Sequence, residues 1–426
     1  MDGSFPPNEM IAGPVAVGTD ARRLFRHRLL ARHGMARVNA VLHHWVLRPA
    51  MRVLVMIFYT ARYGRAVRRH YGIPIRRQIA EQLHLIFADG INPKIYYFLE
   101  LYRMWTADIG GQCLMRYEIK NGLLRALHKA RPRTHGRRTS LGHKLAYGDM
   151  CNRYGLPTPE ILVAAAAGSF TWRVATRDAL NRDLFLKPEI SRGSRGALWL
   201  QHIGNDRYLS GDGREMDLDA VLDLVAHRSK AKVQLLQARL VNHRSLADLA
   251  TDSLIVFRIF TCMDRFGQPV ATHAMLRTIS KLEPSWHRID EYAAPVDLVT
   301  GELGLMCGDK QFGPTDWYET HPVTGAQVKG RIVQYWSDIR DLAVAGHRVF
   351  DDRMLLGWDV ALTPDGPVLV EANAYPDTEF LQRVHRRPIG QSRLGEVLDY
   401  QIGQLSPAGD RPMPGPMPTA HLPGRA

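Results

Sequence analysis

Three side chains near the C-terminal end of the sequence, Asp359, Glu371 and Asn373, carry the oxygen atoms that hard divalent cations prefer. Mg²⁺ usually keeps water or substrate phosphate oxygens in its remaining coordination positions. Two carboxylates and an amide therefore predict a metal ion that also holds a phosphorylated ligand. The alternative is the polar end of a hairpin, with carboxylates that only face water.

A hairpin must bring these three side chains together. The alternation of apolar and polar residues predicts strands at 358–363 and 367–373, joined by a three-residue turn at 364–366. Counting outward from that turn places Asp359 opposite Glu371, where Cβ atoms are about 5 Å apart. The asparagine lies two residues further along its strand and points to the same face.

Composition limits the class of protein. The chain has 426 residues, of which 45% are hydrophobic, so we expect two or three domains with sizeable cores. No apolar run approaches the ~20 residues of a membrane span, and the first residues lack the pattern of a secretory signal. The four cysteines are widely spaced, which is typical of reduced thiols in a cytoplasmic protein and not of disulfides or zinc sites.

Positive charge is concentrated in the first third. Residues 1–150 contain 25 Lys and Arg against 9 Asp and Glu, a balance of +16, whereas the whole chain carries +14. Residues 48–71 could form a helix that lies on an acidic membrane at the inner face, but we favour a helix packed in a core with a solvated basic side. We expect no specific binding of nucleic acid, because no RNA-binding signature accompanies the basic region.

The remaining pattern predicts helices and strands in both halves of the chain. Helices are expected at 48–71, 75–87, 93–106, 141–154, 217–228 and 334–350. Strands are expected at 161–166, 183–187, 197–202, 232–237, 254–262 and 269–276, and a long irregular segment at 283–330. The aromatic stripe within 93–106 is expected to be core, and the basic segment 129–138 to be a solvated linker.

A lysine and a glycine-containing loop follow one of these strands. Lys187 ends an apolar strand, and Gly193 and Gly196 allow backbone N–H groups to approach a phosphate closely. Arg192 and Arg195 add positive charge to the same loop. A plain hairpin turn is the alternative, and the sequence is not that of a Walker loop.

Arg258 lies in the middle of an apolar strand, LIVFRIFTC, where an unpaired charge would cost several kcal/mol. It therefore needs an anionic partner, either a ligand or the pair Asp359 and Glu371. The strand 232–237 runs into residues 238–240, whose backbone could pair with a planar base, although an ordinary buried strand is the alternative reading.

The order of these features resembles the ATP-grasp fold, in which two α+β subdomains clamp ATP. More specifically, the chain resembles the sugar-transfer-associated ATP-grasp family over about residues 45–400. The segments that carry this resemblance are HPVTGAQVKG at 321–330 and GWDVALTPDGPVLVEANAYPD at 357–377.

The resemblance implies roles for particular residues. Lys144 and Lys187 would bind the phosphates of ATP, and backbone groups of Ala238 and Leu240 would bind the adenine edge beside Gln237. The loop over the β- and γ-phosphates would consist of Ser191, Arg192, Gly193, Ser194, Arg195 and Gly196. Many relatives have an acidic residue at the position of Gln237.

It also implies a catalytic centre. Arg258, together with Lys187, would stabilise the transferring phosphoryl group, and Asp359, Glu371 and Asn373 would hold one or two Mg²⁺ ions. Many ATP-grasp ligases carry an α/β domain before the clamp that forms part of the acceptor site. Here the front of the chain is basic and helical, so the acceptor site cannot be transferred.

The expected organisation is a helical front end followed by the clamp. We expect a disordered N-terminus at 1–19, a basic helical region at 20–140, ATP-grasp subdomains at 141–240 and 241–405, and a disordered, proline-rich tail at 406–426.

The implied activity is an ADP-forming ligase that uses ATP and Mg²⁺ to couple a small-molecule carboxylate to an amine or a sugar-linked acceptor, in the modification of sugars or surface polysaccharide. Arg192, Arg195 and Arg277 are candidates to hold the acceptor carboxylate, with solvent-facing arginines as the alternative. Two other functions remain open. One is a kinase that stops at a phosphorylated hydroxyl, and the other is a basic protein that binds acidic membranes or polyanions peripherally.

Overall fold

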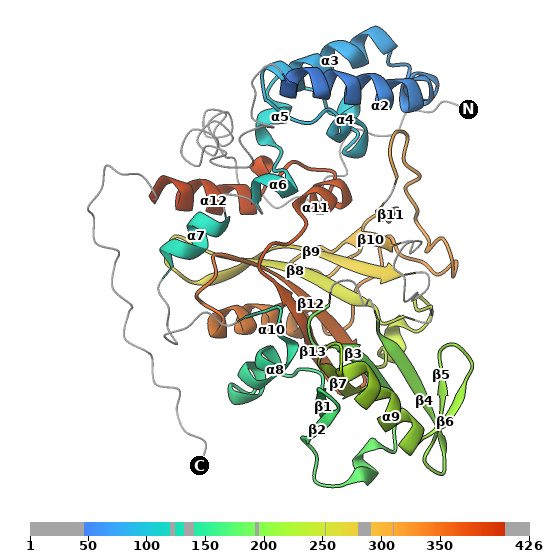
Figure 1. Cartoon of the computed structure of the whole chain (residues 1–426). Helices are drawn as coiled ribbons and strands as arrows, with labels where there is room; N and C mark the ends of the chain where they lie inside the picture. Colours follow the sequence, from blue (N-terminus) through green and yellow to red (C-terminus); the bar gives the residue numbers. More distant parts are fainter. Residues whose placement is uncertain are drawn as a thin grey trace.

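The computed structural model describes residues 47–119, 124–131, 140–191, 196–251, 253–279, 291–309 and 311–404. Within these ranges the chain forms a group of front helices and two antiparallel sheets. The front helices lie at one end, the seven-stranded sheet at the other, and the six-stranded sheet between them (Figure 1). The predicted segments at 1–19 and 406–426, and residues 132–138 of the predicted linker, lie outside the described residues.

The front region is helical, as the sequence predicts. Its elements are α2 (Leu47–Tyr71), α3 (Ile75–Phe87), α4 (Lys94–Phe98), η2 (Leu101–Arg103), α5 (Ile109–Gln112), α6 (Arg116–Glu118) and α7 (Leu124–Ala130). The helix predicted at 93–106 is broken, because Glu100 adopts a left-handed backbone conformation with φ 52°. Its carboxylate accepts hydrogen bonds from the Thr315 amide at 2.9 Å and from the Trp317 indole at 3.0 Å. The aromatic stripe around this break is buried, as expected.

The exposed side of α2 is less basic than predicted. Met56, Thr60 and Val67 are buried against the other front helices, so the helix is packed. Its outer side is not uniformly basic, however, because Leu54 and Phe58 are about three-fifths exposed there. No helix in the described part of the chain is long and apolar enough to cross a membrane.

The seven-stranded sheet has the order β2-β1-β7-β3-β4-β5-β6. Its strands are β1 (Ile161–Ala166), β2 (Ser169–Trp172), β3 (Leu184–Pro188), β4 (Leu198–Gly204), β5 (Arg207–Ser210), β6 (Glu215–Asp217) and β7 (Gln234–Ala238). Three helical elements accompany it: α8 (Lys144–Arg153), η4 (Arg177–Leu180) and α9 (Leu218–Ser229). Val221 and Val225 of α9 pack on one face against Leu184 and Leu236. The opposite face meets α8 through Leu145.

The six-stranded sheet has the order β11-β10-β9-β8-β12-β13. Its strands are β8 (Val256–Met263), β9 (Pro269–Ile279), β10 (Glu291–Pro295), β11 (Cys307–Gly308), β12 (Leu355–Thr363) and β13 (Gly366–Asn373). The helical elements of this half are η5 (Arg244–Leu246), α10 (Trp336–Val349), α11 (Thr378–Val384), η6 (Ile389–Gln391) and α12 (Arg393–Gln404). The prediction of an irregular segment at 283–330 is wrong where β10 and β11 lie.

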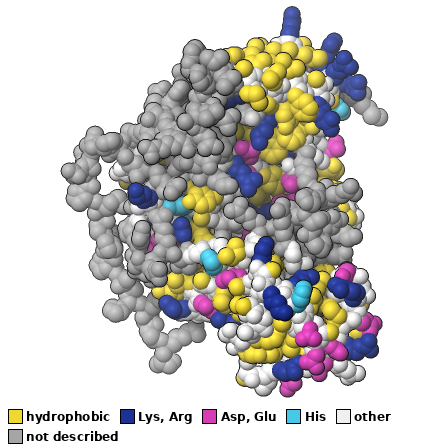
Figure 2. All heavy atoms as spheres, in the orientation of Figure 1, with side chains coloured by type: hydrophobic (Ala, Val, Ile, Leu, Met, Phe, Trp, Pro, Cys, Tyr) yellow, Lys and Arg dark blue, Asp and Glu magenta, His cyan; other side chains and the backbone are white. Residues whose placement is uncertain are grey.

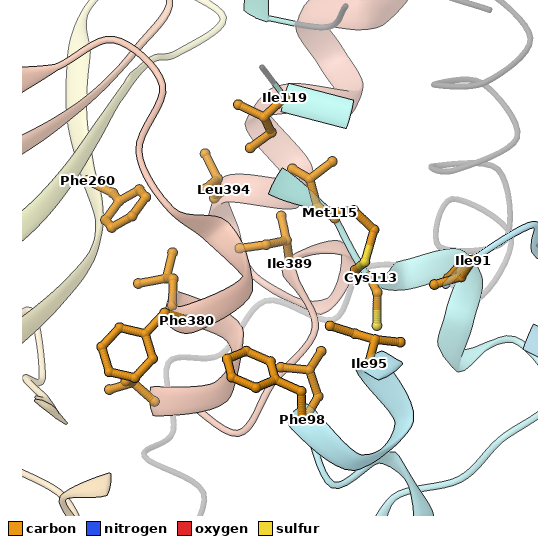
Figure 3. Close-up of a cluster of buried hydrophobic side chains, with 14 of the residues drawn as sticks. Ile91, Ile95, Phe98, Cys113, Met115, Ile119, Phe260, Phe380, Ile389 and Leu394 are labelled. Atoms are coloured by element: carbon orange, nitrogen blue, oxygen red, sulfur yellow. The ribbon is translucent and has the colours of Figure 1, made fainter. Parts of the chain in front are cut away.

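Alternate residues of the six-stranded sheet face two different cores. Phe257 and Trp358 pack against α10, whose Trp336 and Ile339 belong to the same cluster. Phe260, on the opposite face, joins a cluster that includes the front helices as well as α11 and α12. Figure 3 shows this second cluster. Its labelled members are Ile91, Ile95, Phe98, Cys113, Met115, Ile119, Phe260, Phe380, Ile389 and Leu394. The front region therefore shares one core with the sheet.

Candidate active site

The charged side chains of the six-stranded sheet converge because of strand register. Asp359 of β12 is paired with Arg258 of β8 on one side and with Glu371 of β13 on the other. Paired residues point to the same face of a sheet, as do residues two apart in one strand. Asn373 therefore joins this face, which is opposite to the face that packs on α10.

The predicted pairing of Asp359 with Glu371 is confirmed, but the predicted three-residue turn is wrong. Thr363 pairs directly with Gly366, which leaves only two residues in the turn. The extra residue lies instead at Val370, where the register shifts between β12 and β13. This β-bulge restores the pairing that the longer turn would have given.

Arg258 has the carboxylate partner that its burial requires. Its Nε donates to one oxygen of Asp359, and its Nη2 donates to the other at 2.8 Å. The Nη1 of Arg277 lies 3.4 Å from Asp359 Oδ1. Burial alone would raise the pKa of Asp359, but the two guanidinium groups outweigh it and lower the pKa below its usual value.

Glu371 lies in a different electrostatic environment. Burial, and then repulsion by Asp359, raise its pKa, although Arg258 acts in the opposite direction. The Nδ2 of Asn373 donates to Glu371 Oε1 at 3.3 Å. A carboxylate with a raised pKa beside a second carboxylate gains from a bound cation, and all three donors offer oxygen. The set therefore fits Mg²⁺ chemically. The described residues contain no cluster of three or more His, Cys, Asp or Glu side chains arranged for a metal.

Arg277 does not face solvent, although the sequence left a solvent-facing arginine open as the alternative. Its side chain is only 17% exposed, and its Nε donates to Glu291 of β10. The strand predicted at 269–276 stops one residue too early to include it. Counting by twos from Met275, which pairs with Arg258, would have placed it on the charged face. Glu291 was missed because its segment has no strand periodicity.

Two lysines approach this charged face from the other half of the molecule. Lys187 is paired with Leu235 and so points to the face of the seven-stranded sheet that meets α8. Burial and the nearby charge of Lys144 lower the pKa of Lys187 to about 8, while Glu371 acts in the opposite direction. Glu371 belongs to the six-stranded sheet, so charges from both sheets influence one another here.

Lys144 begins α8 and is held by the segment after β3. Its Nζ donates to the carbonyl oxygens of Glu189 at 3.0 Å and Ser191 at 3.2 Å, and it lies 3.3 Å from Ser191 Oγ. Burial lowers the pKa of Lys144 below its ordinary value, although the charges of Glu371 and Glu189 act in the opposite direction. This lysine is therefore hydrogen-bonded to the start of the predicted phosphate loop and is influenced by the charge of Glu371.

The described residues cover the two ends of that loop. Ser191 follows β3, and Gly196 adopts a φ of +77°, a conformation that L side chains rarely adopt. A Cβ atom at Gly196 would also lie 3.3 Å from Pro188 Cγ. The predicted residues Arg192, Gly193, Ser194 and Arg195 lie outside the described residues.

The predicted adenine-binding residues lie at the end of β7. Gln237 is buried and pairs with Phe185 of β3. The amide of Ala238 donates to Glu160 O at 3.1 Å, so this N–H is already used. The Leu240 N–H makes no hydrogen bond to the described part of the protein. Of the two predicted backbone N–H groups, the one still available to a planar base is therefore that of Leu240.

A cavity of about 470 Å³ lies beside η5 and is lined by Arg244–Asp248 and Arg331–Gln334. None of the predicted site residues lines it. The convergence of charged groups, and not this cavity, defines the candidate active site.

Known structures with a similar arrangement were found among ligases. They include a D-alanine–D-alanine ligase from Bacillus anthracis (12% identity, TM-score 0.30) and the VanG D-Ala:D-Ser ligase from Enterococcus faecalis (15%, 0.35). A third is D-alanyl-alanine synthetase A from Vibrio cholerae (9%, 0.35). The matches cover 61%, 62% and 62% of this chain and 61%, 61% and 64% of those proteins, which is less than two thirds of each. Similarity at this level carries no functional argument. No curated protein matches the sequence significantly.

The sequence itself matches a family model. Residues 131–392, more than half of the chain, match the family described as sugar-transfer associated ATP-grasp. This match confirms the resemblance and the α+β fold class predicted from the sequence. The chain belongs to the sugar-transfer-associated ATP-grasp family.

Proposed function

We propose that this protein is an ATP- and Mg²⁺-dependent ligase that activates a carboxylate as an acyl phosphate and couples it to an amine or a similar nucleophile. The observation that carries this proposal is that Lys144 of α8 and Lys187 of β3 are both coupled electrostatically to Glu371 of β13, which pairs with Asp359 of β12. Cations and a metal-binding acid pair on opposite sides suit a triphosphate between them.

The chain's own residues have separate roles in this proposal. Lys144 and Lys187 bind phosphate oxygens, and the Leu240 N–H orients the adenine. Asp359, Glu371 and Asn373 hold Mg²⁺, which would supply positive charge that neutralises the triphosphate when bound. Arg258 is fixed by Asp359 and lies on the same face, where it can stabilise the phosphoryl group in transfer.

The chemistry balances without a protein nucleophile. A substrate carboxylate oxygen attacks the γ-phosphorus, the bond from that phosphorus to the β–γ bridging oxygen breaks, and ADP leaves. The nucleophile then attacks the acyl carbon, loses a proton and displaces inorganic phosphate. The protein contributes positioning and charge stabilisation. The family description favours a sugar-linked acceptor, in the modification of sugars or surface polysaccharide.

The first experiment is calorimetric titration with ATP, with and without Mg²⁺. We expect wild-type protein to bind ATP in a Mg²⁺-dependent manner and Glu371→Ala to lose that dependence. Glu302→Ala, which removes an exposed carboxylate remote from the charged face, is the matched control. A wild-type protein that binds no ATP with Mg²⁺ would contradict the proposal.

Substrates can then be screened by ADP release. An amide or ester product supports the ligase, whereas a phosphorylated hydroxyl would assign the protein as a kinase.

A further inference from the structure

The exposed side of α2 is apolar in its first half and basic in its second half. Met51, Leu54, Ile57 and Phe58 are 55–61% exposed, although they are large and apolar. At 100° per residue, all four fall on one side of the helix. Exposed apolar side chains that are contiguous, and not scattered, commonly mark an interaction site.

The same side continues as a row of arginines. Arg62, Arg65, Arg68 and Arg69 are exposed and fall on the arc of the helix that the apolar side chains occupy. Residues 47–71 contain no Asp or Glu. Within the described residues, none of these four arginines forms an ion pair. We call the four apolar residues and four arginines the α2 surface.

A cavity of about 460 Å³ opens beside this surface, between α2 and α3. Its walls are mainly apolar, and one arginine of the α2 surface, Arg65, also lines it. The lining residues are Met56, Ile57, Thr60, Ala61, Arg65, Ile75 and Ile79. An apolar cavity with a guanidinium group on its wall suits an acyl chain beside an anionic head group.

Figure 2 shows broad hydrophobic surface at the end of the molecule formed by the front helices, with Lys and Arg side chains around it. This end is opposite to the seven-stranded sheet, which carries Lys187 (Figure 1). A large partner bound to the α2 surface would therefore leave the far half of the molecule uncovered.

We propose that the α2 surface binds an anionic lipid bilayer peripherally. Its apolar side chains enter the boundary between head groups and acyl chains, and its arginines contact lipid phosphates. Nucleic acid would match the arginines, but it offers no apolar environment for Leu54 and Phe58. A second copy of the chain, docked through the same helix, would place more arginines and no acidic side chain of α2 against these arginines. The inference does not depend on the proposed ligase activity.

The test is flotation of the full-length protein with vesicles of phosphatidylcholine, with and without phosphatidylglycerol. We expect binding only to vesicles that contain phosphatidylglycerol, weakened by high salt. Replacing Arg65 and Arg69 with Gln should lower the partition coefficient by roughly 25-fold, about fivefold for each arginine. Replacing Leu54 and Phe58 with Ser should lower it at least about tenfold.

Matched controls separate the surface from net charge and from general hydrophobicity. Lys230→Gln with Arg348→Gln removes the same charge from exposed positions on the other side of the molecule. Phe266→Ser with Val299→Ser removes apolar side chains that are 71% and 83% exposed elsewhere. Both control proteins should bind like the wild type. Circular dichroism and thermal melting of the Ser and Gln variants check that they are folded.

Several results would overturn the proposal. They are no flotation of the wild type, equal binding to neutral vesicles, or equal losses in the control variants. Binding to inorganic polyphosphate that competes fully with vesicles and survives Leu54→Ser with Phe58→Ser would assign the surface to soluble polyanions. A dimer in solution that this double variant dissociates would assign it to a second copy of the chain.

Discussion

The two carboxylates of the candidate site differ in their neighbours, and this difference separates their properties. Asp359 is held by Arg258 and approached by Arg277, so it stays ionised. Glu371 has a raised pKa and an amide donor from Asn373. When environments push the pKa values of neighbouring acids apart, the two acids can serve different roles. Here Asp359 orients the arginines, and Glu371 is the carboxylate that gains most from a metal ion.

Lys187 gives a prediction with opposite signs for binding and for stability. Its pKa of about 8 means that it loses its charge as pH rises from about 7 to about 9. The affinity for Mg²⁺-ATP should fall over this range. The free energy of unfolding of the free protein should increase over the same range, because the lysine of the unfolded chain keeps its proton to higher pH than the folded one.

Titration calorimetry and chemical denaturation across this pH range measure the two effects. In Lys187→Arg the cation persists at all these pH values, so the decline in ATP affinity should largely disappear. An equal decline in this variant would show that another group titrates.

Arg277→Ala should destabilise the fold even without ligand. The change leaves Glu291, whose side chain is 11% exposed, without the guanidinium that pairs with it. Breaking a buried ion pair from one side costs about 3–5 kcal/mol. Arg182→Ala, which breaks an exposed pair with Glu160, should cost no more than about 1 kcal/mol. Urea denaturation compares the two, and similar small losses would contradict the structural role of Arg277.

At the scale of elements, periodicity was sufficient for the long helices and most strands. Helix 75–87 and strand 161–166 coincide with α3 and β1, and helix 334–350 contains α10. Hydrophobic patterns specify which face of an element is buried. They do not specify where an extra residue is accommodated, so the bulge at Val370 was predicted as a longer turn.

Sequence patterns also failed where a tertiary contact overrides local preference. Glu100 breaks a helical pattern because Thr315 and Trp317, more than 200 residues away, hydrogen-bond its carboxylate. The same reason explains Glu291, whose strand β10 is held by pairing with β9 and β11. Lys144, Lys187, Arg258, Asp359 and Glu371 stand out in the sequence because their order resembles that of the ATP-grasp fold. The sequence also indicated the pairing of Asp359 with Glu371 and a carboxylate partner for Arg258, but not the ion pair of Arg277 with Glu291.

The packing of α10 on the six-stranded sheet depends on one glycine. A Cβ atom at Gly346 would lie 2.9 Å from a ring carbon of Trp358 and 3.0 Å from Leu369 Cδ1. Both neighbours belong to the core, so Gly346→Ala should force the helix away from the sheet and cost about 1–3 kcal/mol.

Thermal unfolding measures this loss. Gly142→Ala is the control, since a Cβ atom there meets nothing within 4 Å. If both variants melt together with the wild type, the contact at Gly346 is looser than the structure describes.

For the whole molecule, the decisive feature is the core shared by the front helices and the six-stranded sheet. Arg383 of α11 strengthens it, because its Nη1 donates to Phe98 O and its Nη2 donates to Thr315 Oγ1 at 2.7 Å. The sheet face that carries Phe260 also carries Arg258, two residues earlier in β8. The front region thus supports the strand that carries Arg258, the arginine that we propose to be catalytic.

A chain that starts at residue 140 should therefore not fold normally. It would expose the side chains of Phe260, Phe380 and Leu394 that the front helices help to cover. We expect aggregation, or loss of a cooperative melting transition, in size-exclusion chromatography and calorimetry. A soluble fragment that melts cooperatively and binds ATP like the full chain would show that the front region folds separately.

Because the pKa of Lys187 is low, nucleotide binding should also take up protons from the buffer. A lysine that is partly neutral near pH 8 becomes fully charged when a triphosphate sits against it, and the missing fraction of a proton must come from the buffer. The heat of nucleotide binding would then change with the ionisation enthalpy of the buffer. Titrations in HEPES and in Tris would give the same affinity but different heats, and their difference would count the protons taken up.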